Sequence, residues 1–130
     1  MTEYPEQELT RRIIQAAIEV HSLLGPGYLE SIYGDALTHE FNLRDIPFER
    51  EKSMQVQYKG VIVGEHRLDF MVAGRVVVEI KGVSRFHEAF RAQVISYLKA
   101  TGLKVGLLLN FGMPTFAMPT MKEGITRVVL

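Results

Sequence analysis

The chain has 130 residues, no cysteine, 47% hydrophobic residues, and 15 Lys and Arg against 15 Asp and Glu. This composition suits one globular domain and excludes a disordered chain, a disulfide framework and a thiolate zinc site. No apolar run reaches the roughly 18 residues that span a bilayer, and residues 1–12 lack the charged-then-apolar order of a signal peptide. We therefore expect a single domain over residues 1–130 that lies in the cytoplasm and outside any membrane.

Charge is distributed unevenly along the chain. Residues 1–58 hold 5 Lys and Arg against 10 Asp and Glu, whereas residues 59–130 hold 10 against 5. The basic second half suits a polyanion bound to one face, because a local excess of positive charge attracts phosphates without a basic domain overall. Mutual attraction of the two halves explains the same asymmetry, and charge alone does not choose between these readings.

The first part of the chain has the apolar spacing of helices. Residues 8–24 repeat apolar side chains at intervals of three and four, which predicts a helix. Gly25-Pro26-Gly27 ends it, because Gly and Pro together break helical geometry. A second helix is expected over residues 29–42, and Ile46-Pro47 marks the loop after it.

The remainder predicts strands interrupted by one helix. Strands are expected over residues 48–58, 61–72 and 76–80, the last one buried on both faces. Helical spacing returns over residues 85–100, and an apolar strand over 105–109 follows, an order typical of a parallel crossover. Residues 113–124 are expected to form a loop, and residues 125–130 an edge strand. The order α-α-β-β-β-α-β-β predicts an α/β domain with a mixed central sheet flanked by helices.

Two carboxylates and an ammonium interrupt the apolar strands. If residues 73–75 form the hairpin loop, Asp69 lies opposite Glu79, with Cβ atoms about 5 Å apart. Glu79 and Lys81 share a face of their strand, because side chains alternate. Two carboxylates at this distance repel unless a cation lies between them, and oxygen ligands suit Mg²⁺ or Mn²⁺. The alternative is structural: Asp69 caps the hairpin, and Glu79 pairs with Lys81 at the surface.

Three further residues extend this pattern. Gln93 and Tyr97 are four residues apart on the next helix, so they share a face that begins near the carboxylates. They suit a phosphate or a metal-bound water, or else a polar stripe beside the core. Glu30 lies in the first turn of the second helix, where the helix dipole alone also favours a carboxylate.

Taken together, an early helical Glu, then Asp, E-x-K and Q-x-x-x-Y resemble the PD-(D/E)XK nuclease superfamily in its RecB-like arrangement. Five segments also resemble the GxxExxY family, a branch of that superfamily whose name motif is Gly27 to Tyr33 here. This resemblance covers roughly residues 9–112; the segments are VHSLLGPGYLESIY, YKGVIVGEHRLDFMV, VVVEIKGV, QVISYLKATG and LLLNFG.

The resemblance implies a restriction-endonuclease-like core and a role for each candidate residue. Asp69 and Glu79 would bind the metal with the backbone carbonyl of Ile80, and Glu30 would approach from its helix. Lys81 would orient the attacking water. The remaining pair, Gln93 and Tyr97, would support the phosphate or the lysine.

The leading hypothesis is a Mg²⁺- or Mn²⁺-dependent nuclease that hydrolyses phosphodiester bonds, with DNA as the expected substrate. One alternative is a catalytically silent module of the same fold that binds nucleic acid or protein, since fold does not dictate activity. Another is a hydrolase of a small phosphorylated molecule. A homo-oligomer is expected, because a small nuclease domain often cuts both strands as a dimer.

Overall fold

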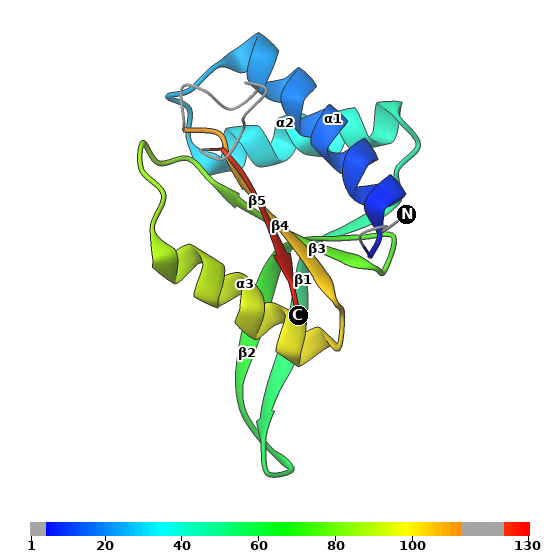
Figure 1. Cartoon of the computed structure of the whole chain (residues 1–130), viewed down its shortest axis with the longest axis vertical. Helices are drawn as coiled ribbons and strands as arrows, with labels where there is room; N and C mark the ends of the chain where they lie inside the picture. Colours follow the sequence, from blue (N-terminus) through cyan, green and yellow to red (C-terminus); the bar gives the residue numbers. More distant parts are fainter. Residues whose placement is uncertain (1–4, 113–123) are drawn as a thin grey trace.

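The computed structural model describes residues 5–112 and 124–130 of the chain. Three helices and five strands follow the expected order, and most boundaries agree within one residue (Figure 1). Residues 113–123 of the loop expected over residues 113–124 lie outside the described part of the chain. The elements are α1 (Gln7–Leu24), α2 (Glu30–Leu43), β1 (Phe48–Tyr58), β2 (Val61–Val72), β3 (Val76–Lys81), α3 (Glu88–Thr101), β4 (Val105–Asn110) and β5 (Ile125–Val129).

The predicted α/β architecture with a mixed sheet is confirmed. The five strands follow in the order β1-β2-β3-β4-β5, and only β3 and β4 run parallel. This parallel pair is joined through α3, as the helix-then-strand pattern predicts. Residues 76–80 of β3 are all buried, because both faces of this central strand are covered by helices. Among the described residues, no helix is long and apolar enough to cross a membrane.

The helices form layers on both faces of the sheet. On one face, Ile13 of α1 and Leu37 of α2 pack with Val78 and Leu107. On the other face, Leu98 of α3 packs with neighbouring side chains of β3 and β4, including Val77 and Leu108. The alternation of side chains along β3 and β4 therefore serves two cores at once.

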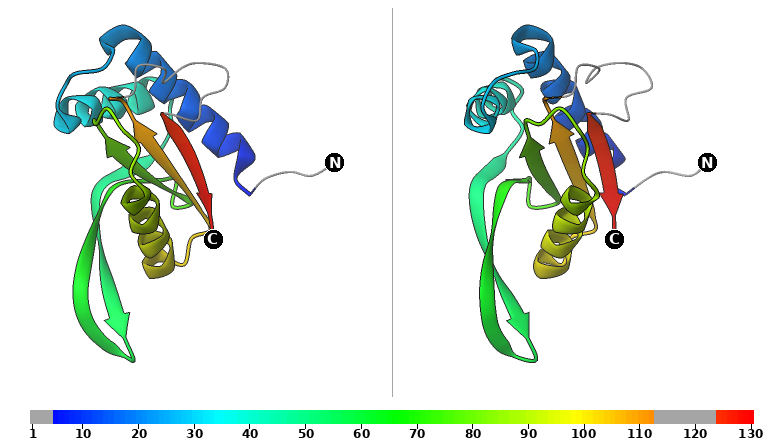
Figure 2. Two further views of the ribbon diagram at one scale, coloured as in Figure 1. Left: turned by 60° about the vertical axis from the view of Figure 1, so that its left-hand side comes forward. Right: turned by 90° about the vertical axis from the view of Figure 1, so that its left-hand side faces the viewer.

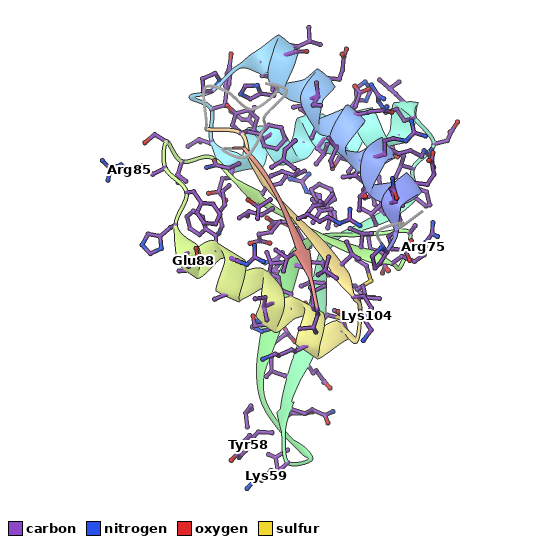
Figure 3. The ribbon with its side chains drawn as sticks, in the orientation of Figure 1. Tyr58, Lys59, Arg75, Arg85, Glu88 and Lys104 are labelled. Carbon is purple, nitrogen blue, oxygen red and sulfur yellow. The ribbon has the colours of Figure 1, made fainter. Side chains whose placement is uncertain are left out.

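One part of the fold leaves these layers. Beyond Met54 and His66, the paired ends of β1 and β2 extend away from the helices and from the other strands (Figure 2). We call residues 55–65 the arm. Only Val56 of the arm is half-buried, and every other side chain in it is exposed. The arm ends in a turn with Tyr58 and Lys59 at the tip of the molecule (Figure 3).

One predicted boundary is wrong. The third helix was expected from residue 85, but α3 begins at Glu88. His87 has extended backbone, and its imidazole Nδ1 accepts a hydrogen bond from the Ala89 N–H at 3.2 Å. This cap satisfies an N–H that the helix leaves without a partner, so the helix begins after His87.

Candidate functional site

The candidate site lies where β2 separates from β3. The hairpin register pairs Val72 with Val76, as the sequence predicted, and the backbone ladder continues to Phe70 and Val78. At the next position the Asp69 carboxylate replaces a backbone acceptor, because its Oδ2 accepts the Ile80 N–H at 2.7 Å. The strands can therefore part while the amide of Ile80 stays paired. This contact holds Asp69 beside β3.

Glu79 is the most strongly perturbed acid of the site. Its side chain is only 6% exposed. Burial is the largest cause that raises the pKa of Glu79 to about 8, and the negative charge of Asp69 adds to it, while Lys81 acts in the opposite direction. Among the described residues its Oε1 has no hydrogen-bond partner. A buried carboxylate oxygen of this kind is costly unless a proton or a cation approaches it.

Lys81 follows two residues later on the same face. Its ammonium Nζ lies 3.6 Å from Glu79 Oε2. The same Nζ lies 4.8 Å from the centre of the Phe90 ring on α3. A cation over an aromatic face is attracted by the ring's electron density. Phe90 and Glu79 thus fix the ammonium from opposite sides of the gap between β3 and α3.

Tyr97 lies near the two carboxylates, whereas Gln93 makes no polar contact with them. Burial raises the pKa of Tyr97 to about 12, and the charges of Glu79 and Asp69 contribute. Its phenol therefore stays protonated at neutral pH and can donate a hydrogen bond. Gln93 is half-buried on the preceding turn, and its backbone carbonyl accepts the Ser96 hydroxyl at 2.6 Å.

Glu30 is the first residue of α2 and is exposed. It lines a cavity of about 210 Å³ together with Asp69 and Ile80, so it faces the site from the α2 side. The last residue of the Gly27-to-Tyr33 motif has a different task. The buried Tyr33 hydroxyl donates to the Gly25 carbonyl at 2.5 Å and accepts the Tyr28 N–H at 3.2 Å. Tyr33 therefore holds the loop that leads into Glu30.

The carboxylate oxygens at the site are suitable ligands for a hard divalent cation. Asp69 and Glu79 offer carboxylate oxygens side by side, and the buried Glu79 Oε1 has no other partner in the described part of the chain. Mg²⁺ is commonly held by one or two carboxylates, with water and substrate phosphate completing its shell. Residues 5–112 and 124–130 contain no group of three or more His, Cys, Asp or Glu side chains that could hold a metal. Glu30 lines the same cavity as Asp69 without forming such a group with the two carboxylates.

Three residues near the site were not predicted. Phe90 contacts Lys81, and Arg50 lines the cavity that contains Asp69. Asn110 lies opposite Lys81, and its Oδ1 accepts the N–H groups of Val83 at 3.0 Å and Gly112 at 3.1 Å. A polar residue directly after the apolar run of β4 was the only sequence signal among the three.

The chain was compared with curated proteins, with solved structures and with models of protein families, and a family model matches it. No curated protein and no solved structure matches the chain significantly. A family model described as the PD-(D/E)XK nuclease superfamily matches residues 7–128. The match includes every candidate residue of the site, from Glu30 to Tyr97.

Proposed function

Because the chain belongs to the PD-(D/E)XK nuclease superfamily, we propose that it is a Mg²⁺- or Mn²⁺-dependent nuclease with DNA as its expected substrate. One observation carries the proposal. Asp69, Glu79 and Lys81 meet at the point where β2 and β3 separate, and a buried Glu79 oxygen there has no partner in the described residues. We further place the chain in the GxxExxY branch with its RecB-like arrangement, on the motif residues from Gly27 to Tyr33.

The proposed cation ligands are Asp69, Glu79 and the Ile80 carbonyl, with Glu30 approaching from α2. A bound Mg²⁺ or Mn²⁺ supplies a more acidic water and neutralises charge on the phosphate. Asp69 enters the reaction already oriented, because its Oδ2 is fixed by the Ile80 N–H.

Lys81 and Tyr97 supply donors to the reaction. Lys81 orients the attacking water and balances charge on the phosphate, because Phe90 and Glu79 fix its ammonium. The protonated Tyr97 donates to a phosphate oxygen, and Gln93 on the turn before it supports the same phosphate. The water oxygen bonds to phosphorus and one ester P–O bond breaks; one proton of the water ends on the released oxygen, and the other stays on the new phosphate hydroxyl or leaves to solvent.

The surface around α3 suits a polyanion. A cavity of about 600 Å³ lies between α3 and the base of the arm, lined by polar groups that include Gln55, His66 and Lys99. Arg85, at the loop before α3, extends into solvent (Figure 3). Among the described residues of α3 and of the loop before it, three cations form no ion pair, namely Arg85, Arg91 and Lys99. These free cations favour phosphate binding over mutual attraction of the two halves.

The test is a cleavage assay on wild type, Lys81→Ala and Lys104→Ala. Each protein is incubated with single- and double-stranded DNA and RNA in Mg²⁺, Mn²⁺ or EDTA. We expect wild type to cut DNA only with a divalent cation, and Lys81→Ala to lose at least about 100-fold in rate, because it removes a preorganised charge at the phosphate. Lys104→Ala removes the same charge at the far end of α3 and should cut normally.

Two other outcomes would count against the proposal. Equal cutting by wild type and Lys81→Ala would show that the activity arises elsewhere. Folded wild type that binds nucleic acid but cuts none of the four substrates would support the silent binding module instead, and cutting of RNA alone would change the substrate class. Sedimentation of the wild type with and without a DNA duplex tests the expected homo-oligomer in the same preparation.

A further inference from the structure

A small cavity of about 210 Å³ lies on the α2 side of the candidate site. It contains one cation among several carboxylates, and it shares Asp69 and Ile80 with the proposed cation ligands. The cation is Arg50, at the inner end of β1. The lining residues that bear on its role are Glu30, Gly34, Arg50, Glu51, Asp69 and Ile80.

Arg50 is held in this cavity from two elements. On α2, its Nη1 donates to Asp35 Oδ1 at 2.6 Å and to Thr38 Oγ1 at 3.5 Å. On β2, the Phe70 ring lies under the guanidinium carbon, 5.7 Å from the ring centre. An arginine fixed in this way loses little conformational freedom when it binds a ligand.

The absence of a side chain at Gly34 makes room for Arg50. A Cβ atom at Gly34 would lie 2.5 Å from Arg50 Nη2, closer than two such atoms can approach. Glycine is otherwise unfavourable inside a helix such as α2. In the described part of the chain, both side-chain hydrogen bonds of Arg50 use Nη1. Its Nε and Nη2 make no hydrogen bond within the described residues, and they lie beside Gly34, which also lines the cavity.

We propose that Arg50 binds a phosphate group of the nucleic-acid strand, beside the phosphate at Asp69 and Glu79. This inference rests on the proposed function. Guanidinium binds phosphate through two parallel hydrogen bonds, and Nε with Nη2 forms such a pair. Glu30, Glu51 and Asp69 line the same cavity and would repel a phosphate, so Arg50 contributes to binding only when a divalent cation offsets these charges.

The test measures DNA binding in a Lys81→Ala background, so that the probe is not consumed. Fluorescence anisotropy of a short labelled DNA duplex is followed over a range of KCl concentrations, once in Mg²⁺ and once in EDTA. In Mg²⁺ we expect Arg50→Ala to weaken binding about tenfold and to lower the slope of log K against log salt by about one, the value for one lost phosphate contact. In EDTA the difference should vanish.

Two further variants separate binding from folding. Gly34→Ala keeps the charge of Arg50 but displaces its guanidinium, so affinity should fall while Tm does not, because alanine favours the helix. Asp35→Asn removes the ion pair between Arg50 and α2 but keeps the phosphate donors, so Tm should fall more than affinity. Arg75→Ala is the matched control, because Arg75 pairs with Glu6 away from the cavity and carries the same charge.

The inference is overturned if Arg50→Ala and Gly34→Ala bind the duplex as tightly as the Lys81→Ala parent. Equal Tm losses in Arg50→Ala and Asp35→Asn, with unchanged affinity, would assign Arg50 to a purely structural contact. Failure of the proposed function has a different signature. If the parent that retains Arg50 binds no nucleic acid in Mg²⁺, the nuclease proposal and the phosphate subsite are both contradicted.

Discussion

The two ends of the β1–β2 hairpin share one ladder yet have opposite surroundings. At the inner end, Phe70 and Val72 are fully buried, and Asp69 and Arg50 lie between helix α2 and β3. At the outer end, the arm exposes Val61, more than half of which is accessible. Both ends have suitable β-forming residues. What differs is the neighbours, so strand propensity alone does not decide where a site can be held rigidly.

The largest expected contrast concerns stability. Phe70→Ala should cost about 3–5 kcal/mol, because it removes a buried ring that packs on Phe41 and Phe48 and supports Arg50. Ile62→Ala in the arm should cost less than about 0.5 kcal/mol, since Ile62 is 56% exposed. Urea unfolding of both variants measures the difference. Similar losses would mean that the arm is covered in solution, for example by a second copy.

The second contrast compares two glutamates through pH. A carboxyl with pKa 4.5 in the unfolded chain and about 8 in the fold binds its proton more tightly when folded. Below pH 4.5, burial of the Glu79 carboxyl therefore does not lower the free energy of unfolding. As pH rises from about 4.5 to 8, it lowers this free energy progressively. One pKa unit corresponds to about 1.4 kcal/mol, so the whole effect is a few kcal/mol.

Tm measured in EDTA across this pH range tests the contrast. Relative to wild type, Glu79→Gln should gain stability as pH rises, whereas Glu65→Gln in the exposed arm should track wild type. Added Mg²⁺ should reduce the loss in wild type alone, because a cation favours the ionised carboxylate. Parallel curves for wild type and Glu79→Gln would contradict the pKa shift.

The smallest contrast concerns the two turns on either side of β2, one before Val61 and one after Val72. Lys59 at the arm tip and Ala73 at the inner end both have left-handed backbone, with φ of 49° and 53°, and each precedes a glycine. Asparagine tolerates this conformation better, so Lys59→Asn should stabilise the fold by up to about 1 kcal/mol. Ala73→Asn should gain less, because Ala73 packs against the core and a buried amide offsets the benefit. Thermal unfolding of both variants checks the order.

The sequence predicted what depends on local geometry. The register that places Val72 opposite Val76 follows from a short loop, and side-chain alternation then places Glu79 and Lys81 on one face. Arg50 was missed because its environment combines α2, β1 and β2. Its pairing with Asp35 spans 15 positions and depends on how α2 crosses the sheet. No periodicity within one element reports such a crossing.

Two other results have the same physical cause. The start of α3 was predicted too early because residues 85–87 continue the helical spacing. The hydrogen bond accepted by the His87 side chain, which the spacing does not reveal, marks the true start of the helix. The contact between Phe90 and Lys81 depends on the distance between α3 and β3, which packing sets and the pattern of either element does not. The roles of the candidate residues stay predictions until the variants are measured.

The hydrogen bond between Asp69 and Ile80 makes one backbone signal a sensor of the site. The acceptor of the Ile80 N–H is the Asp69 carboxylate, and a cation bound to this carboxylate would draw electron density away from the hydrogen bond. In a ¹⁵N–¹H NMR spectrum, the Ile80 cross-peak should therefore shift when the site fills, while amides in the arm stay in place. Binding of a cation at the site can then be followed by titration, in the absence of nucleic acid and of any reaction.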